Sequence, residues 1–140
     1  MAGAPFTQLV LKATTGVLNC RVLTVSGPSQ GAVAVAATSV PIGITDSFTK
    51  YPPGTAADSP SGTIAESGDP IPYIGAGRMA LAFVGAGGVT GGTLVEAGAL
   101  GVVVAKGAAG AGKWTVGWAV QTATANSYAQ IFVDPHANQA

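Results

Sequence analysis

Glycine and proline interrupt this chain so often that long regular elements have little room to form. The 140 residues include 21 glycines and 9 prolines, and both residue types weaken or break helices and strands. No stretch between them carries sustained helical periodicity with caps. Short runs rich in valine, isoleucine, threonine and aromatic residues recur instead, at spacings of about 8–12 residues that are typical of sandwiches and barrels. The sequence therefore predicts an all-β fold, a single small domain that is an antiparallel sandwich or barrel-like.

The expected strands follow these apolar runs: Gln8–Lys12, Arg21–Val25, Ala32–Ala37, Val40–Thr45, Gly62–Ala65, Ile71–Ile74, Met79–Val84, Thr93–Glu96, Gly101–Ala105, Trp114–Val120 and Ala129–Val133. The clearest alternation puts four apolar residues on one face of a strand: Trp114, Val116, Trp118 and Val120. A period of two indicates a half-buried strand. We therefore expect both tryptophans to lie in the core, with an assembly interface as the alternative.

The domain organisation has three parts. Residues 1–12 form an extended N-terminal arm or a first strand, residues 13–135 the β domain, and residues 136–140 a C-terminal tail. Within the domain, residues 46–69 are a long Pro-rich loop, since Pro52-Pro53 and Ser59-Pro60 prevent continuous ladders. Loops of this length are usually functional or mobile.

Charge is scarce in this chain, at 9% of residues, and the formal net charge is zero. Six cations among 140 residues make neither the basic patch of a nucleic-acid binder nor a polybasic membrane anchor. The apolar stretch 79–105 is broken by a glycine-rich segment, and the N-terminus lacks the pattern of a secretory signal. We expect no nucleic-acid partner and no membrane span. The single cysteine, Cys20, excludes an intramolecular disulfide and is expected to be a small buried hydrophobe.

Two short motifs imitate catalytic loops. The stretch "GAAGAGKW" (107–114) fits a phosphate-binding loop up to Lys113, but Trp114 replaces the magnesium-binding hydroxyl and a strand follows where a helix is needed. The stretch "GPSQG" (27–31) fits the esterase pattern around Ser29, but it lies between two expected strands. The lone His136 comes later, in the expected tail. We interpret both motifs as ordinary turns.

The acidic residues show no metal-binding pattern. Asp58, Glu66 and Asp69 lie in or beside the long loop and could gather a calcium ion, but a solvated loop is the better interpretation. A polar catalytic constellation is lacking. We therefore predict no catalytic residues, no cofactor, no metal and no enzymatic activity.

Four segments taken in order resemble the decoration, or cement, proteins of tailed-phage capsids. They are "GAVAVAATSVPIGIT" (31–45), "GDPIPYIGAGRMALAFVGAGGVTGGTLV" (68–95), "LGVVVAKG" (100–107) and "WTVGWAVQTATANSYAQIFVDP" (114–135). The matching features are the "PIGIT" strand end, the strand after "GD", the "GGVTGG" turn and a final unit that leads into a terminal strand. The long Pro-rich loop and the tryptophans depart from the family pattern.

The resemblance implies a β-rich structural protein, usually a homotrimer, on the outer capsid surface of the virion. Such a protein bridges neighbouring subunits of the major capsid protein and catalyses no reaction. The N-terminal arm is one candidate contact, because an extended segment can add a strand to a partner; a plain internal strand is the alternative. The long loop is a second candidate, with a self-packed surface loop as the alternative. The contact residues expected are Pro5, Phe6, Gln8 and Leu9 in the arm and Phe48, Tyr51, Pro52 and Pro53 in the loop.

The alternative function is a carbohydrate- or receptor-binding β-sandwich module, such as a head-fibre domain. This function needs exposed aromatic side chains with polar neighbours on one face. Trp114, Trp118 and Tyr128 would supply them. Burial of both tryptophans would exclude it.

Overall fold

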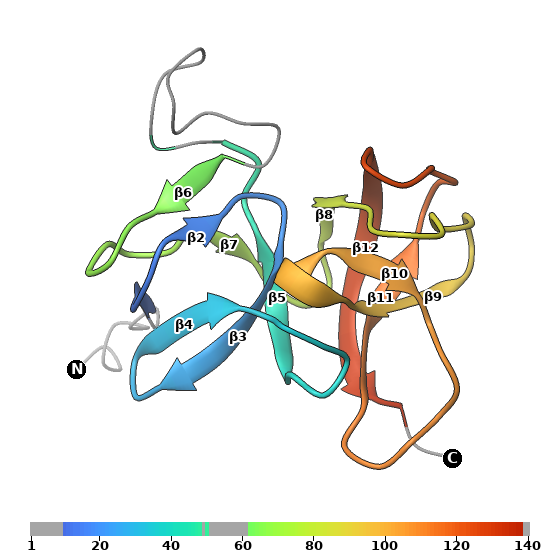
Figure 1. The fold of residues 1–140 in the computed structure, drawn as a ribbon, viewed down its shortest axis with the longest axis horizontal. Coiled ribbons are helices and arrows are strands. Elements are labelled where there is room, and N and C mark those ends of the chain that lie inside the picture. The colour runs from blue at the N-terminus through green and yellow to red at the C-terminus, as the bar shows by residue number, and fades with distance from the viewer. Residues whose placement is uncertain (1–9, 49, 51–61, 139–140) are drawn as a thin grey trace, which may run out of the picture.

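The computed structural model describes residues 10–48, 50 and 62–138, which form an all-β domain (Figure 1). The predicted fold class, a small all-β domain with sandwich-like and barrel-like sheets, is confirmed. The strands are β1 (Lys12–Ala13), β2 (Val17–Leu18), β3 (Val22–Gly27), β4 (Gln30–Val33), β5 (Pro41–Thr45), β6 (Thr63–Ala65), β7 (Tyr73–Ile74), β8 (Met79–Phe83), β9 (Leu94–Ala97), β10 (Val103–Ala105), β11 (Trp114–Ala119) and β12 (Tyr128–Ala137). Within the described ranges the helical structure is limited to one short 3-10 turn, η1 (Ala99–Gly101).

The first sheet has five strands in the order β1-β4-β3-β5-β7, and β2 pairs separately with β6. Its centre is a hairpin of β3 and β4, whose register runs from the pair Leu23–Val33 to the pair Gly27–Gln30. Ser29 closes the hairpin with a left-handed φ of 55°. The esterase-like motif is therefore a strand, a turn and a strand, as we expected.

The second sheet has five strands in the order β10-β9-β11-β12-β8 and curls toward a barrel. Its two edges meet at one end, where Val84, just after β8, forms a parallel bridge with Val103 of β10. The backbone N–H of Gly85 donates to the carbonyl of Val103 at 2.9 Å. Small residues on the inner face, among them Ala80, Ala82, Ala119 and Ala129, leave room for this curl.

The two five-stranded sheets share one core, and a second core joins the first sheet to the β2–β6 pair. The shared core joins Val95, Val116, Ile131 and Val133 of the second sheet to Val22, Ala34 and Ile44, which come from the first sheet and its connections. The second core contains Leu11, Val17, Leu23, Ile64 and Ile71. Each such side chain stabilises the fold by about 1.5–3 kcal/mol when fully buried. The shared core therefore holds the two sheets in one domain, side by side in Figure 1.

Arg21 is a buried polar link between the two sheets. Its side chain is only 4% exposed, and its Nη1 donates to the Leu100 carbonyl at 2.8 Å. The guanidinium carbon lies 4.8 Å from the centre of the Phe83 ring, a cation–π contact. Burial lowers the pKa of Arg21 from its usual value. The neighbouring Cys20 is 1% exposed, as predicted, and burial raises its thiol pKa to about 11.

Several strand bounds differ from our expectations; β4, for example, runs from Gln30 to Val33 where we expected Ala32–Ala37. The pair β2 and β6 includes Val17–Leu18, where we expected no strand. Strand β12 continues through Pro135 to Ala137, so His136 lies in a strand and not in a tail. Its Nδ1 lies 2.7 Å from the Asp134 carbonyl oxygen.

Candidate interaction surface

The outer face of the second sheet carries most of the large aromatic side chains that the structure describes. Strands β8, β12, β11 and β9 turn alternate residues away from the core. We call this surface the aromatic face. It consists of Met79, Leu81, Phe83, Leu94, Trp118, Val120, Tyr128, Gln130 and Phe132.

One row of this face crosses four strands in register. Leu94 pairs with Trp118, Trp118 with Phe132, and Phe132 with Met79. The rings of Trp118 and Phe132 lie 5.9 Å apart, centre to centre. Cross-strand pairs of this kind contribute roughly 0.2–1 kcal/mol each. The row therefore also fixes the register of the strands that carry it.

Two further rows complete the face. In one, Gln130 pairs with Leu81, and the N–H of Val120 donates to the Gln130 carbonyl at 2.8 Å. In the other, Tyr128 pairs with Phe83, and their rings meet edge to face at 5.3 Å. Burial raises the pKa of Tyr128. The buried Arg21 guanidinium contacts the Phe83 ring, so this end of the face is covered by the first sheet.

The tryptophans do not lie in the core, so that prediction was wrong. Trp118 is 47% exposed and Trp114 is only partly buried. Val116 and Ala119 are three residues apart, yet both belong to the shared core. The strict alternation that we expected along residues 114–121 therefore breaks between them.

The break has a physical cause in the pairing of β11 with β12. From the pair Thr115–His136 to the pair Gly117–Val133, β11 advances two residues and β12 three. The extra residue falls in the segment with Pro135, which has no N–H to give to a ladder. A β-carbon at Gly117 would overlap the carbonyl oxygen of Phe132. Glycine at 117 thus permits the irregular pairing that precedes the outward-facing Trp118.

The centre of the aromatic face is exposed and uncharged. Met79 is 54% exposed, Trp118 47%, Val120 48% and Leu81 37%. Charged side chains lie at its two ends: Arg78, Asp134 and Glu96 border one end, and the Arg21 guanidinium contacts Phe83 at the other. Contiguous apolar patches on a protein surface usually mark interaction sites. We therefore identify this face as the candidate interaction surface.

Of the contact residues expected from the sequence, the structure describes only Phe48, and Phe48 does not lie on this face. Phe48 is 52% exposed and stands beyond the end of β5, on the side of the first sheet. The backbone around it is held by two hydrogen bonds, from Asp46 N to the Pro72 carbonyl and from Lys50 N to the Thr63 carbonyl. The other expected contacts stay predictions, since they lie outside the described residues: Pro5, Phe6, Gln8, Leu9, Tyr51, Pro52 and Pro53.

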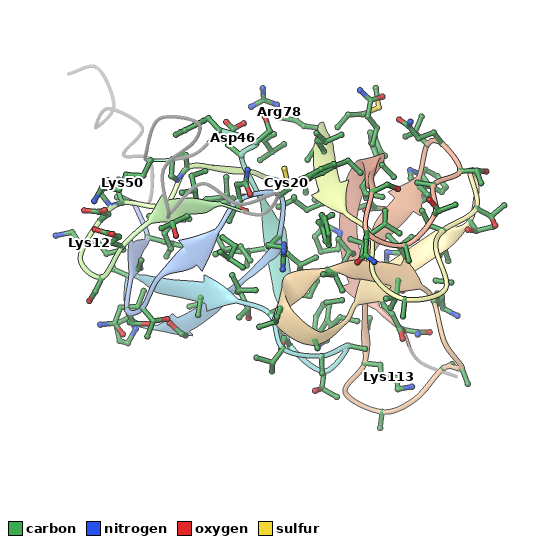
Figure 2. All side chains as sticks on the ribbon, turned by 45° about the horizontal axis from the view of Figure 1, so that its top comes forward. Lys12, Cys20, Asp46, Lys50, Arg78 and Lys113 are labelled. Atoms are coloured by element: carbon green, nitrogen blue, oxygen red, sulfur yellow. The ribbon has the colours of Figure 1, made fainter. Side chains whose placement is uncertain are left out.

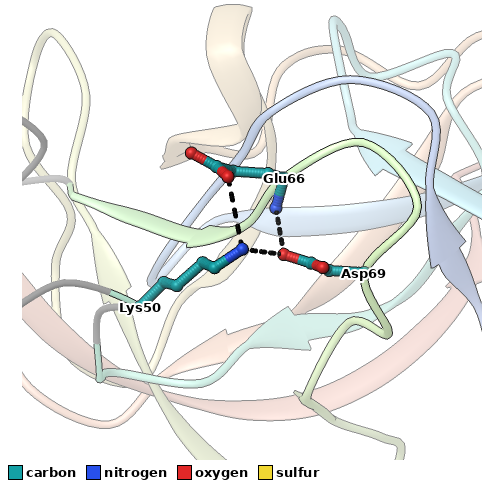
Figure 3. A network of polar contacts seen from close by, with 3 residues as sticks. All are labelled: Lys50, Glu66 and Asp69. Carbon is teal, nitrogen blue, oxygen red and sulfur yellow. Dashed lines mark hydrogen bonds and ion pairs between the residues drawn. The ribbon is translucent and has the colours of Figure 1, made fainter.

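The acidic residues beside the long loop bind a lysine (Figure 3). Lys50 Nζ lies 2.5 Å from Asp69 Oδ2 and 3.2 Å from Glu66 Oε2. The same Asp69 oxygen accepts the Glu66 N–H at 3.0 Å. These contacts lower the pKa of Asp69 and raise that of Lys50. Asp58 lies outside the described residues, and within them no group of three potential metal ligands gathers. An ion-pair network thus occupies the place considered for calcium.

The other sequence motifs form turns in the described structure. Lys113 Nζ donates to the Ala108 carbonyl at 3.2 Å, and Trp114 then begins β11. The labelled cations Lys12, Lys50, Arg78 and Lys113 are spread around the molecule and form no single basic patch (Figure 2). No helix in the described ranges is long and apolar enough to cross a membrane.

The fold is similar to that of a known phage protein. The crystal structure of the head fiber gp8.5 N base in bacteriophage phi29 superposes with a TM-score of 0.56. The match covers 89% of this chain and 91% of that chain, at 16% sequence identity. At this identity the similarity shows a shared fold. No family model matches the sequence, and no curated protein matches it.

Proposed function

We propose that this chain is a structural protein of a phage head, carried on the outer surface of the capsid. The observation that carries the proposal is the fold shared with the phi29 head fiber base over nearly the full length of both chains. The ordered set of sequence segments that resembles phage decoration proteins supports the same class. The proposed role involves no reaction.

The finer role that we propose is that of a cement protein. The chain would bind the major capsid protein, bridge neighbouring subunits and assemble with copies of itself, as a homotrimer in the simplest case. Low charge is compatible with this role, since many identical copies bound to one shell turn modest contacts into firm attachment. The proposed capsid contacts are the arm with Pro5, Phe6, Gln8 and Leu9 and the loop with Phe48, Tyr51, Pro52 and Pro53.

The test is co-sedimentation with expanded capsids that lack this protein. Increasing amounts of the chain are added, and the pelleted protein is compared with the capsid subunit by gel densitometry. We expect saturation at a fixed ratio that matches a class of symmetry sites. A variant with Phe6→Ala and Phe48→Ala should bind more weakly, and Val35→Ala, at a site 71% exposed, serves as the control. Absence of saturable binding to capsids from the same source would overturn the proposal.

A second candidate function, a head-fibre module that binds a glycan or receptor, is favoured by one observation. Trp118 lies on the same outer face as Tyr128 and Phe132, and it is 47% exposed. Flat aromatic surfaces of this kind can stack on sugar rings. Glycan-array binding that disappears in Trp118→Ala, without capsid binding, would select this function over the cement role.

A further inference from the structure

We infer that the aromatic face is an interface between copies of this chain, and that a second copy covers it in the assembled state. The inference rests on the surface of the described residues and does not depend on the capsid role. Self-association and capsid binding can therefore fail separately.

The size of the face suits a protein interface. Its four most exposed residues, Met79, Leu81, Trp118 and Val120, are between 37% and 54% exposed. Side chains of this size and exposure present an apolar area of roughly 400 Å², within the range of the largest apolar patch on a typical monomer, a patch that is often functional. A contact that buries such a patch on each of two copies removes roughly 800 Å² from water, so residues around the patch must also take part for the contact to reach the ~1,000 Å² or more of specific interfaces.

The charged residues around the face suit contact with a second copy, because they include both signs of charge. None of the residues that define the face is Lys, Arg, Asp or Glu; Arg78, Asp134 and Glu96 border one end of it, and the buried Arg21 contacts Phe83 at the other. Among the described residues Arg78 has no ion-pair partner, and Asp134 has only His136, at 3.9 Å. A second copy brings both signs of charge to this surface. An acidic or a basic partner would instead leave one of the two opposed by a like charge.

The edge of the sheet adds a second argument. Strand β8 pairs with β12 on one side. Within the described residues, its other side has one backbone hydrogen bond, from the Phe83 N–H to the Cys20 carbonyl at 2.9 Å, before the chain meets β10 at Val84. The strand sequence "MALAF" has no charge and no proline, the devices that normally protect exposed edges from association. The exposed residues of β8, Met79 and Leu81, belong to the aromatic face. A second copy that covers this face would therefore also cover the edge of β8.

A glycan fits the same surface less well. Sugar recognition combines stacking with hydrogen bonds from well-placed polar groups. Gln130 is the only amide side chain within the face, and aliphatic Met79, Leu81 and Val120 surround it. Such a surface favours dry packing against another apolar surface.

The experiment measures the oligomeric state of the full chain by sedimentation velocity from about 1 to about 100 µM, a range in which moderately stable assemblies form and dissociate. Variants Leu81→Glu and Trp118→Gln alter the face, and Val25→Glu is the matched control, at a 49% exposed site of β3 in the first sheet. Circular dichroism checks that each variant folds. If Leu81→Glu does not fold, Trp118→Gln still tests the inference. We expect a defined oligomer for the native chain and for Val25→Glu, and association at least tenfold weaker for the face variants.

Three results would overturn the inference. One is a native chain that stays monomeric at the highest concentration. Another is an oligomer that both folded face variants leave intact. The third is a monomeric chain that binds a glycan and loses that binding in Trp118→Gln, which would make the face a glycan site.

Discussion

The substitution Gly117→Ala tests the local geometry that places Trp118 on the outer face. A β-carbon at position 117 would overlap the Phe132 carbonyl oxygen and lie 3.0 Å from the Asp134 nitrogen. Both atoms belong to the backbone of β12, so no side-chain rotation can relieve the contact. The pairing of β11 with β12 must open locally, at the strands that carry Val116, Ile131 and Val133 of the shared core.

The expected cost follows from two terms. Overpacking a well-packed site costs about 1–3 kcal/mol, and losing a ladder hydrogen bond adds about 0.5–1.5 kcal/mol. We expect Gly117→Ala to lower the free energy of unfolding by about 2–4 kcal/mol. For a domain of this length that corresponds to a fall in Tm of roughly 6–15 °C.

Guanidinium unfolding followed by circular dichroism, together with calorimetry, measures this change. Gly16→Ala is the matched control, because a β-carbon at Gly16 meets nothing within 4 Å and φ there is not left-handed. The control should change stability by less than about 0.5 kcal/mol or raise it slightly. A Gly117→Ala protein as stable as the control would refute the proposed β11–β12 register, and with it the placement of Trp118.

Three further predictions concern buried and paired polar groups. Arg21→Ala should lower the free energy of unfolding by about 2–3 kcal/mol, since it leaves the Leu100 carbonyl without its donor and removes the cation–π contact; chemical denaturation measures this, and Arg78→Ala should change little. Cys20 should resist alkylation in the native state, because its thiol is buried. Folding raises the pKa of this thiol from 9.0 to about 11. The contribution of Cys20 to stability is therefore complete below pH 9 and is lost as pH rises toward 11. Between pH 9 and 11 the free energy of unfolding should therefore fall less in Cys20→Ala than in the native chain. An equal fall with pH in the two proteins would contradict this prediction. The carboxyl of Asp69 should titrate below 3.8 by NMR, so its contribution to stability is present above that pH and is lost as pH falls through the lowered pKa. In Lys50→Ala the midpoint of the Asp69 titration should return toward 3.8. An unmoved midpoint would argue against the ion pair.

Much of the fold could be predicted from the sequence because its signals are local. The runs that predicted strands at Met79–Val84 and Trp114–Val120 correspond to β8 and β11. Alternation and Gly or Pro breaks act within a few residues, so they are readable without knowing the partner strand. The short β2, at Val17–Leu18, carried no such pattern and depends on its pairing with β6.

The aromatic face could be predicted only in part. The sequence offered Trp118 and Tyr128 as exposed aromatic residues in the alternative function, but the main expectation buried Trp118. Its true side depends on how β11 pairs with the Pro135 segment of β12, a contact between positions far apart in the chain. The row from Leu94 to Met79 likewise depends on sheet order, which no local pattern encodes.

The proposed function is best tested by a cryo-electron microscopy reconstruction of the phage heads to which, under that proposal, this chain binds. We expect density with this all-β fold on the outside of the capsid, at a fixed class of symmetry sites, with the aromatic faces of neighbouring copies in contact. Heads whose outer surface lacks such density would contradict the proposed function. Bound single copies with the aromatic face open to solvent would leave the outer-capsid role standing but overturn both the proposed homotrimer and the proposed self-interface.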